Sequence, residues 1–336
     1  MVERTELPPD AQILQVLFGF MLTKGLSAAA SLNVADELEN GPMYYTDLAS
    51  AVDADQKALH RVMRMLTSAG IFQETKPGEY GNNPASDLLR TNHQASMRDL
   101  AVMMTSNSHW LPWGRLAEVL RTGVSGSQHA FGTDLFTWFQ RDENKEEWEI
   151  FNSAMTSFSS GVARLVVEAY DFTPFRKIVD IGGGHGGMLS RILEKTPDAQ
   201  AVLFDLPGVV EGAPSLGERV EIVGGDFFEA VPKGGDCYTL KHIIHDWSDE
   251  DCKKILGNIA AAMEPGGKVF VIELVMPESP EPHPAKFMDV NMLALTEGGS
   301  ERTEAEYADL FSSAGLKLNA IHPTQGPVSL VEAAKA

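Results

Sequence analysis

The feature that most constrains the fold is the alternation of short apolar runs with helical segments after Pro174. Runs typical of buried strands lie in KIVDIGG, AVLFDLP, RVEIVGGDFF, GDCYTLKHII and GGKVFVIELV. Between them, GMLSRILEKTP and SDEDCKKILGNIAAAMEPGG have the apolar spacing of helices. Strands that alternate with helices of this length predict a parallel, doubly wound α/β sheet with helices on both faces. Ligands of such a sheet bind beyond the carboxyl ends of its strands.

A glycine loop, VDIGGGHGGM, follows the first of these strands. Gly182, Gly184 and Gly187 match the GxGxxG pattern, in which glycines let the backbone turn tightly and approach a ligand. Asp205 ends the next strand, where a carboxylate can accept hydrogen bonds from ribose hydroxyls. The order of strand, loop, helix, strand and acid predicts a cofactor that carries a nucleoside. The plainer interpretation is a tight turn of an ordinary α/β protein.

Acidic residues around the loop favour a cationic cofactor over a pyrophosphate. Asp180 stands two residues before Gly182, where NAD would place its pyrophosphate and S-adenosylmethionine its positive charge. Asp226 follows the third strand, where it could accept from an adenine amino group while Phe227 packs on the ring. S-adenosylmethionine is therefore the predicted cofactor, with an NAD-dependent oxidoreductase as the alternative.

The first half of the chain has a different, mostly helical pattern. After the helical run AQILQVLFGFMLTKGLSAAASLNVADEL come two short helical patterns and a hairpin pattern with Pro77-Gly78 as its turn, the order of a winged helix. We predict a winged-helix-like domain over residues 1–95 and a second domain over 96–336. The latter comprises an aromatic-rich helical segment, 96–172, and the α/β core, 173–336.

The composition excludes several classes of partner. In 336 residues, 27 Lys and Arg face 47 Asp and Glu, so a net charge of -20 disfavours nucleic acid and anionic lipid. A DNA-binding regulator, suggested by the winged-helix order, is disfavoured for the same reason. We see neither a signal peptide nor an apolar run near the 18 residues of a membrane span, and expect a cytoplasmic protein without a membrane partner. The two cysteines, Cys237 and Cys252, are predicted to be buried thiols.

The stretch KHIIHDWSDE, which ends the fourth strand run, admits three interpretations. His242 and His245 could bind a metal, His245 could be a base, or both could be the polar rim of a strand. Residues three apart on an extended strand point to opposite faces, so a shared metal ion is disfavoured and no metal is expected.

Six motifs in order resemble one known family. VDIGGGHG, LFDLP, GGDFF, LKHIIHDWSDEDC, GGKVFVIE and GGSERT are similar to the successive motifs of the metal-independent, S-adenosylmethionine-dependent O-methyltransferases. This family includes plant caffeic acid and isoflavone enzymes and bacterial polyketide and phenazine methyltransferases of secondary metabolism. The resemblance covers nearly the whole chain and implies a Rossmann-like methyltransferase domain, a dimerisation domain and a homodimer.

The resemblance also implies residue roles. Gly182 would approach the methionine part of the cofactor, Asp205 would hold the ribose, and Asp226, Phe227 and Lys241 would form the adenine site. His245 falls on the general base, with Glu273 and Glu301 as the carboxylates that orient or polarise it. Phe151 and Met155 match positions that line the acceptor pocket. The plainer interpretations are a rim charge for Glu273 and a pair with Arg302 for Glu301.

These inferences together predict methyl transfer to a hydroxyl of a small phenolic or quinone-type acceptor. A phenol has a pKa near 10 and a histidine near 6.5, so full proton transfer would cost about 5 kcal/mol. A carboxylate on the other ring nitrogen lowers that cost because it stabilises the imidazolium. Methylation of nitrogen, or another reaction that keeps the cofactor, is the alternative within the family.

Overall fold

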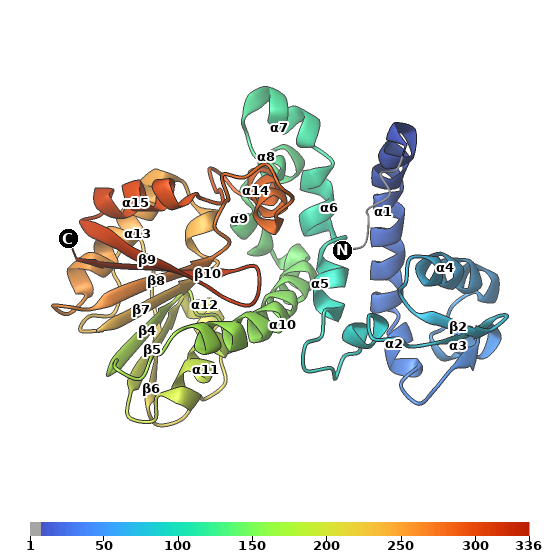
Figure 1. Ribbon diagram of the computed structural model, residues 1–336, viewed down its shortest axis with the longest axis horizontal. Coiled ribbons are helices and arrows are strands. Elements are labelled where there is room, and N and C mark those ends of the chain that lie inside the picture. The colour runs from blue at the N-terminus through green and yellow to red at the C-terminus, as the bar shows by residue number, and fades with distance from the viewer. Residues whose placement is uncertain (1–7, 336) are drawn as a thin grey trace. The chain divides into compact units, whose positions relative to one another are not determined.

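The structure is a computed structural model that describes residues 8–335, with the side chains of 158–160 outside the described part. The chain forms two compact units, and each is described by itself (Figure 1). Unit 1 contains Met1–Trp110 and Glu143–Phe158, and unit 2 contains Leu111–Asp142 and Ser159–Ala336. The chain passes from one unit to the other three times, within α6 (Asn107–Trp113), within the short η2 turn (Asp142–Asn144) and within α10 (Lys145–Ala169).

Unit 1 combines helices with a small antiparallel sheet. The sheet has the order β1-β3-β2, and its hairpin turns at Pro77-Gly78, as predicted. The two short helices that precede the hairpin are also present, and the side chain of Asp55 caps the second by accepting from the Ala58 N–H. The elements are α1 (Pro9–Ser31), α2 (Val34–Glu37), β1 (Met43–Tyr44), α3 (Tyr45–Ala51), α4 (Gln56–Ser68), β2 (Gln73–Lys76), β3 (Glu79–Gly81), η1 (Ser86–Leu89), α5 (Arg98–Met103) and η2 (Asp142–Asn144).

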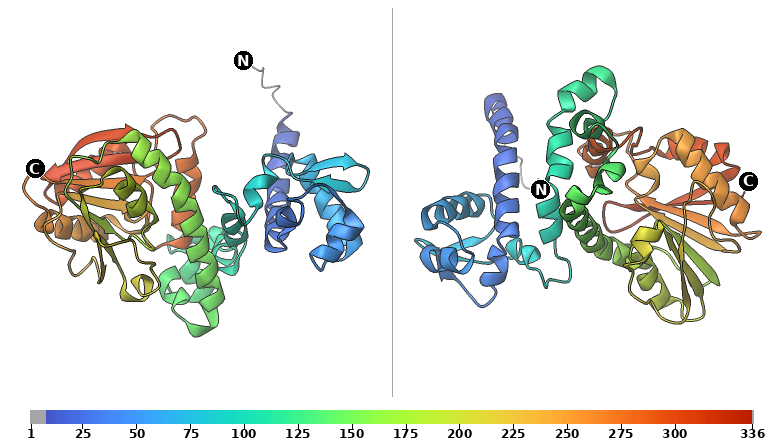
Figure 2. Two further views of the ribbon diagram at one scale, coloured as in Figure 1. Left: turned by 90° about the horizontal axis from the view of Figure 1, so that it is seen from below. Right: turned by 180° about the vertical axis from the view of Figure 1, so that it is seen from behind.

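Helix α1 corrects one premise drawn from the sequence. It is an unbroken rod in both views of Figure 2, and it is long and apolar enough to cross a membrane by length and composition. No uninterrupted apolar run exists there, because polar residues such as Lys24 are interspersed, but the mean hydropathy reaches 1.5. Only 17% of that window is buried, and Val16 is 79% exposed. The helix therefore presents an apolar surface that the described residues of unit 1 do not cover.

Unit 2 is built on a seven-stranded sheet of order β6-β5-β4-β7-β8-β10-β9. Its first five strands are parallel, as predicted, and β9 and β10 add an antiparallel edge that the strand pattern had not indicated. The strands are β4 (Lys177–Ile181), β5 (Gln200–Asp205), β6 (Val220–Gly224), β7 (Cys237–Lys241), β8 (Lys268–Glu273), β9 (Leu316–Pro323) and β10 (Ser329–Lys335). The helices are α7 (Leu116–Thr122), α8 (Gly126–Phe131), α9 (Leu135–Phe139), α11 (Gly187–Lys195), α12 (Pro207–Val210), η3 (Ile244–Asp246), α13 (Asp249–Ala262), α14 (Pro284–Leu295) and α15 (Glu304–Ser313).

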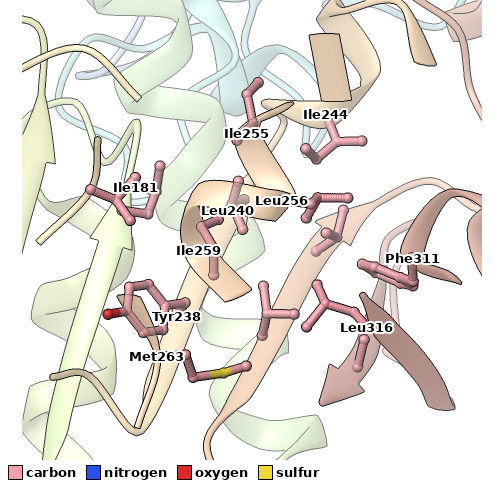
Figure 3. Packing of buried hydrophobic residues seen from close by; sticks show 14 of the residues in the cluster. Ile181, Tyr238, Leu240, Ile244, Ile255, Leu256, Ile259, Met263, Phe311 and Leu316 are labelled. Atoms are coloured by element: carbon pink, nitrogen blue, oxygen red, sulfur yellow. The ribbon is translucent and has the colours of Figure 1, made fainter. Parts of the chain in front are cut away.

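One hydrophobic core cluster of unit 2 lies between the sheet and helices α13 and α15. Figure 3 shows Tyr238 and Leu240 of β7 beside Leu256 and Ile259 of α13. Ile244, from the short η3 turn, belongs to the same fully buried cluster and lies near Leu256 (Figure 3). The packing of Ile244 in this core therefore fixes the turn after β7. Both cysteines are buried free thiols, as predicted.

Candidate active site

The strand order reverses between β4 and β7, and the predicted site residues of unit 2 gather beyond the carboxyl ends of these and the neighbouring strands. The glycine loop follows β4 and the histidine-bearing turn follows β7. Gly182 has a φ of 64°, and a Cβ there would overlap the side chain of Ile243. The absence of a side chain at Gly182 thus lets the glycine loop touch the turn that carries His245.

Asp205 ends β5 and is tied to the loop. Its Oδ2 accepts from the Gly184 N–H at 2.8 Å and its Oδ1 from the Leu206 N–H at 2.7 Å. Burial raises the pKa of this carboxyl, while these backbone hydrogen bonds work against the rise. Each oxygen keeps a further lone pair, so the group can still accept from a hydroxyl.

Asp226 and Phe227 follow β6. The Oδ1 of Asp226 accepts from the Phe228 N–H at 2.8 Å, which fixes the start of this loop. Phe227 is half-buried and packs edge-on against Phe228 and Trp247, with ring centroids 4.9 and 6.0 Å apart. A carboxylate and an aromatic ring are therefore placed together beyond β6.

Asp180 and Lys241 lie at the ends of the two central strands. Asp180 is 1% exposed, and its Oδ1 accepts from Thr239 Oγ1 at 2.7 Å. Its Oδ2 is buried without a hydrogen-bond partner among the described residues. Burial raises the pKa of Asp180 to about 6, and burial lowers that of Lys241 to about 8 against the opposing charge of Asp180.

The turn after β7 differs from the extended strand assumed for the metal argument. His242 has a φ of 53°, in the left-handed region, and Ile244–Asp246 form a 3-10 turn. The rings of His242 and His245 consequently stack at 5.1 Å, so the prediction that they point to opposite faces was wrong. Within residues 8–335, no group of three His, Cys, Asp or Glu is placed to hold a metal ion.

His245 forms a buried pair with Glu301. The imidazole Nδ1 lies 2.8 Å from Oε1 of Glu301, and the two side chains are 7% and 0% exposed. A carboxylate can only accept, so Nδ1 carries the proton, and in the neutral ring Nε2 keeps its lone pair. Asp246 Oδ1 is 3.7 Å from that Nε2, too far for a hydrogen bond but close enough to add negative charge.

Carboxylates make His245 more basic than an ordinary histidine. Burial is the largest single influence and opposes the charged ring, but Asp246, Glu301 and Glu273 together raise the pKa of His245 to about 9. The same crowding affects Asp246, whose pKa burial raises to about 6. The raised pKa of His245 lies closer to the pKa of a phenol. Full proton transfer from a phenol of pKa near 10 to a base of pKa about 9 costs about 1.4 kcal/mol, compared with about 5 kcal/mol for an ordinary histidine.

Glu273 holds the backbone of the turn rather than the imidazole ring. Its Oε1 accepts from the N–H groups of Ile243 and His245 at 3.2 and 3.1 Å, and its Oε2 from the Tyr307 hydroxyl at 2.6 Å. The residue is 0% exposed, so the interpretation as a rim charge is wrong. The suggested pair of Glu301 with Arg302 is wrong as well, because Arg302 binds Asp249 and Glu301 binds His245.

The two predicted acceptor-pocket residues lie on α10 in unit 1. Phe151 packs against Trp148 at 5.9 Å and against the buried His109 at 6.5 Å, and both contacts are stacked. Met155 is half-buried, one helical turn further along. Unit 1 therefore has an aromatic cluster on this helix, and the role of the two residues toward an acceptor stays a prediction.

Sequence reasoning missed the contribution of three residues in or near the turn. Asp246 and Tyr307 were not predicted as site residues, and Arg302 was considered only as a partner of Glu301. Only the position of Asp246 beside His245 gave a signal. Arg302 reaches the turn from the loop before α15, and Tyr307 reaches Glu273 from α15, which no local pattern shows.

The residues present fit a nucleoside cofactor with a positive charge. The carboxylates of Asp180, Asp205 and Asp226 lie at the ends of three adjacent strands, and one oxygen of Asp180 is buried without a donor in the part of the chain that the structure describes. This concentration of negative charge would repel a pyrophosphate and attract a sulfonium or ammonium group.

Comparisons with known proteins match both units. Residues 113–317 match the model of the O-methyltransferase domain and residues 14–92 that of the O-methyltransferase dimerisation domain. The chain is 38% identical to phenazine O-methyltransferase PhzM of Lysobacter antibioticus, over 97% of this chain and 96% of the relative. It is 34% identical to 8-amino-8-demethylriboflavin N,N-dimethyltransferase of Streptomyces davaonensis, over 91% and 90%. The crystal structure of human N-acetylserotonin methyltransferase in complex with S-adenosylmethionine superposes with a TM-score of 0.91 at 30% identity, and all of both chains is covered.

Proposed function

We propose that this chain, which belongs to the S-adenosylmethionine-dependent O-methyltransferases, methylates a hydroxyl of a small aromatic acceptor with His245 as the general base. The observation that carries the proposal is the buried pair of His245 Nδ1 and Glu301 Oε1, 2.8 Å apart, on a turn that touches the glycine loop. In unit 2 the proposed base and the proposed cofactor loop are thus adjacent.

The cofactor site is proposed from the residues around the loop. S-adenosylmethionine supplies an electrophilic methyl group on a cationic sulfonium. Asp205 would accept from the ribose hydroxyls, Asp226 and Phe227 would hold the adenine, and Gly182 leaves room for the backbone to approach the methionine part. Lys241, half-buried at the end of β7 and attracted by the charge of Asp180, would complete the adenine side.

Proton transfer is the contribution of His245. Its Nε2 lone pair would take the proton from the acceptor hydroxyl as the oxygen attacks, while Nδ1–H stays bound to Glu301. The charge of Glu301 stabilises the imidazolium that forms, in the way a triad carboxylate does. Glu273 fixes the backbone N–H of His245 and Ile243, so its part is orientation of the turn.

An aromatic acceptor is supported by residues and relatives of different kinds. Phe151 belongs to a stacked aromatic cluster on α10, and Met155 follows it on the same helix. Flat apolar side chains of this kind suit a planar ring. The relative from Lysobacter antibioticus is named as a phenazine O-methyltransferase, so phenazines and phenols of similar size are the first acceptors to test.

A homodimer would account for the exposed apolar helix of unit 1. Helix α1 lies largely within the segment that matches the dimerisation domain, and eight of its large apolar side chains are exposed. A second copy that covers these side chains removes apolar surface from water. We propose the cytoplasm as its location, with neither nucleic acid nor membrane as partner.

The proposal is tested by incubation of the protein with methyl-labelled S-adenosylmethionine and a panel of phenols, hydroxyquinones, phenazines and aromatic amines. Label on an aromatic oxygen, located by mass spectrometry, is the expected result. A relative of this chain is named as an N,N-dimethyltransferase, so label found only on nitrogen would replace the oxygen acceptor. Label on no acceptor, with no binding of the cofactor, would reject methyl transfer altogether.

A further inference from the structure

The turn that carries His245 is held from two sides by groups of opposite charge. Glu273 takes the backbone N–H groups of Ile243 and His245. On the other side, Arg302 Nη1 donates to the Ile244 carbonyl at 3.1 Å, and its Nη2 donates to the Trp247 carbonyl at 3.0 Å. His245 lies between Ile244 and Trp247 in the sequence. The backbone around it is therefore held by Glu273 at its N–H groups and by Arg302 at its carbonyl groups.

Arg302 is anchored well enough to act in this way. It is 2% exposed, and its Nε and Nη2 donate to Asp249 Oδ1 at 2.9 and 2.7 Å. Nη1 also donates to the Ser300 carbonyl at 3.3 Å, within its own loop. The cation therefore has a charged partner, and its other hydrogen bonds go to carbonyl oxygens and to the Cys252 sulfur at 3.6 Å, as a buried charge requires.

The loop that carries Arg302 also carries the ring partner of His245. Glu301 is adjacent to Arg302, and its backbone N–H donates to Asp289 Oδ1 at 3.0 Å. Gly299, two residues earlier, lies so close to the turn that a Cβ there would overlap the His245 carbonyl oxygen. Any movement of this loop against the turn would change the contact between Glu301 Oε1 and His245 Nδ1.

We propose that Arg302 is a positioning residue that keeps the imidazole of His245 in register with Glu301. The inference rests on the proposed role of His245 as base. Arginine is suited to the task because its planar fork offers five donors in fixed directions, whereas lysine offers one compact ammonium group. The guanidinium group donates to the carbonyls of Ile244, Trp247 and Ser300 and to the carboxylate of Asp249. One ammonium group would not reach all four acceptors together.

The test compares Arg302→Lys and Arg302→Met with a matched control, Arg219→Met. Arg219 is partly buried and, like Arg302, donates to three carbonyls, those of Leu193, Thr196 and Ala199, at the opposite, amino-terminal edge of the strands. Each variant is measured for thermal stability, for S-adenosylmethionine binding by calorimetry, and for kcat and the acceptor KM. The Nδ1–H proton resonance of His245 is followed by NMR with labelled histidine and assigned by its loss in His245→Gln.

We expect Arg302→Met to lower kcat roughly 10²-fold, because misplacement of a reacting group by about 1 Å costs that much. Arg302→Lys keeps the charge and should lower kcat about tenfold, with a changed Nδ1–H resonance. The acceptor KM and cofactor affinity should change less than kcat in both. Arg219→Met should lose stability but keep kcat and the resonance.

Three results separate this inference from the proposed function. If Arg302→Lys keeps both kcat and the resonance while His245→Gln is inactive, the base stands and the role of Arg302 is overturned. If kcat falls equally in Arg219→Met and Arg302→Met, loss of stability explains the effect and the positioning role is also overturned. If His245→Gln is fully active, the proposed base is wrong, whereas the resonance still reports whether Arg302 fixes the ring.

Discussion

Replacement of Glu301 by Gln removes one charge from the pair with His245 and keeps nearly the same shape. The pKa of His245 is raised from 6.5 to about 9, a difference of about 3.4 kcal/mol at roughly 1.36 kcal/mol per pKa unit. Three carboxylates produce this rise against the burial of the ring, and Glu301 is the one that binds it directly. We assign it about 2 kcal/mol, which corresponds to a roughly 30-fold loss of kcat.

The pH dependence gives this prediction a second, independent readout. A general base acts when neutral, so the rate of the native enzyme should rise with pH and level off above about 9. Loss of the Glu301 charge destabilises the imidazolium and lowers the pKa of His245, so the rise should move to lower pH. The native enzyme should therefore exceed the variant most at high pH and least near pH 6.

The assay is the steady-state rate at saturating cofactor and acceptor from pH 6 to 10. Glu304→Gln is the matched control, since it makes the same change three residues away at an exposed position on α15. Equal rates and superimposable pH profiles for Glu301→Gln and the native enzyme would refute the reasoning. A lower rate with an unshifted profile would show that Glu301 acts on shape alone.

Three further predictions concern the cofactor, the turn and metals. Asp205→Asn should weaken S-adenosylmethionine binding by about 1.5–3 kcal/mol, which is the usual contribution of hydrogen bonds to a charged group, and should leave kcat at saturation nearly unchanged. Unaltered affinity in calorimetry would exclude the proposed role of Asp205 in ribose binding. Tyr307→Phe removes the hydroxyl that donates to Glu273 Oε2 at 2.6 Å, and it should lower the free energy of unfolding by about 1–3 kcal/mol in a denaturant titration. The loss of kcat should be smaller than that of Glu301→Gln. Unchanged stability would mean that this contact is not formed in solution. EDTA should leave the rate unchanged, and a loss that added Mg²⁺ or Zn²⁺ restores would return His242 and His245 as candidate metal ligands.

The sequence predicted the parallel part of the sheet because its strands are short and mostly apolar, and they alternate with helical segments and a glycine loop. It did not indicate β9 and β10, because an antiparallel hairpin at the edge of the sheet breaks the alternation. Of the two, β9 is mixed and half-buried along Leu316–Pro323, whereas β10 is largely buried between β8 and β9. The alternation of strand and helix was sufficient for the parallel strands, including the largely exposed edge strand β6, and insufficient for this antiparallel pair.

The site was predictable in its residue types and less so in its contacts. His245 and Glu301 were named as a pair through resemblance, and the structure places them 2.8 Å apart. The backbone role of Glu273 goes together with the left-handed conformation at His242 and the 3-10 turn that follows it. A histidine with φ of 53° is uncommon, and no sequence rule places it there. The error about ring directions in His242 and His245 has the same origin.

The most direct test of the account compares native enzyme and His245→Gln in a single turnover with methyl-labelled S-adenosylmethionine and a phenazine or phenol that the native enzyme methylates. The account predicts nearly equal cofactor affinity and a methyl-transfer rate lower by roughly 10²–10⁴-fold, the usual contribution of a general base. Equal cofactor affinity with an unchanged transfer rate would contradict the central claim that His245 removes the acceptor proton.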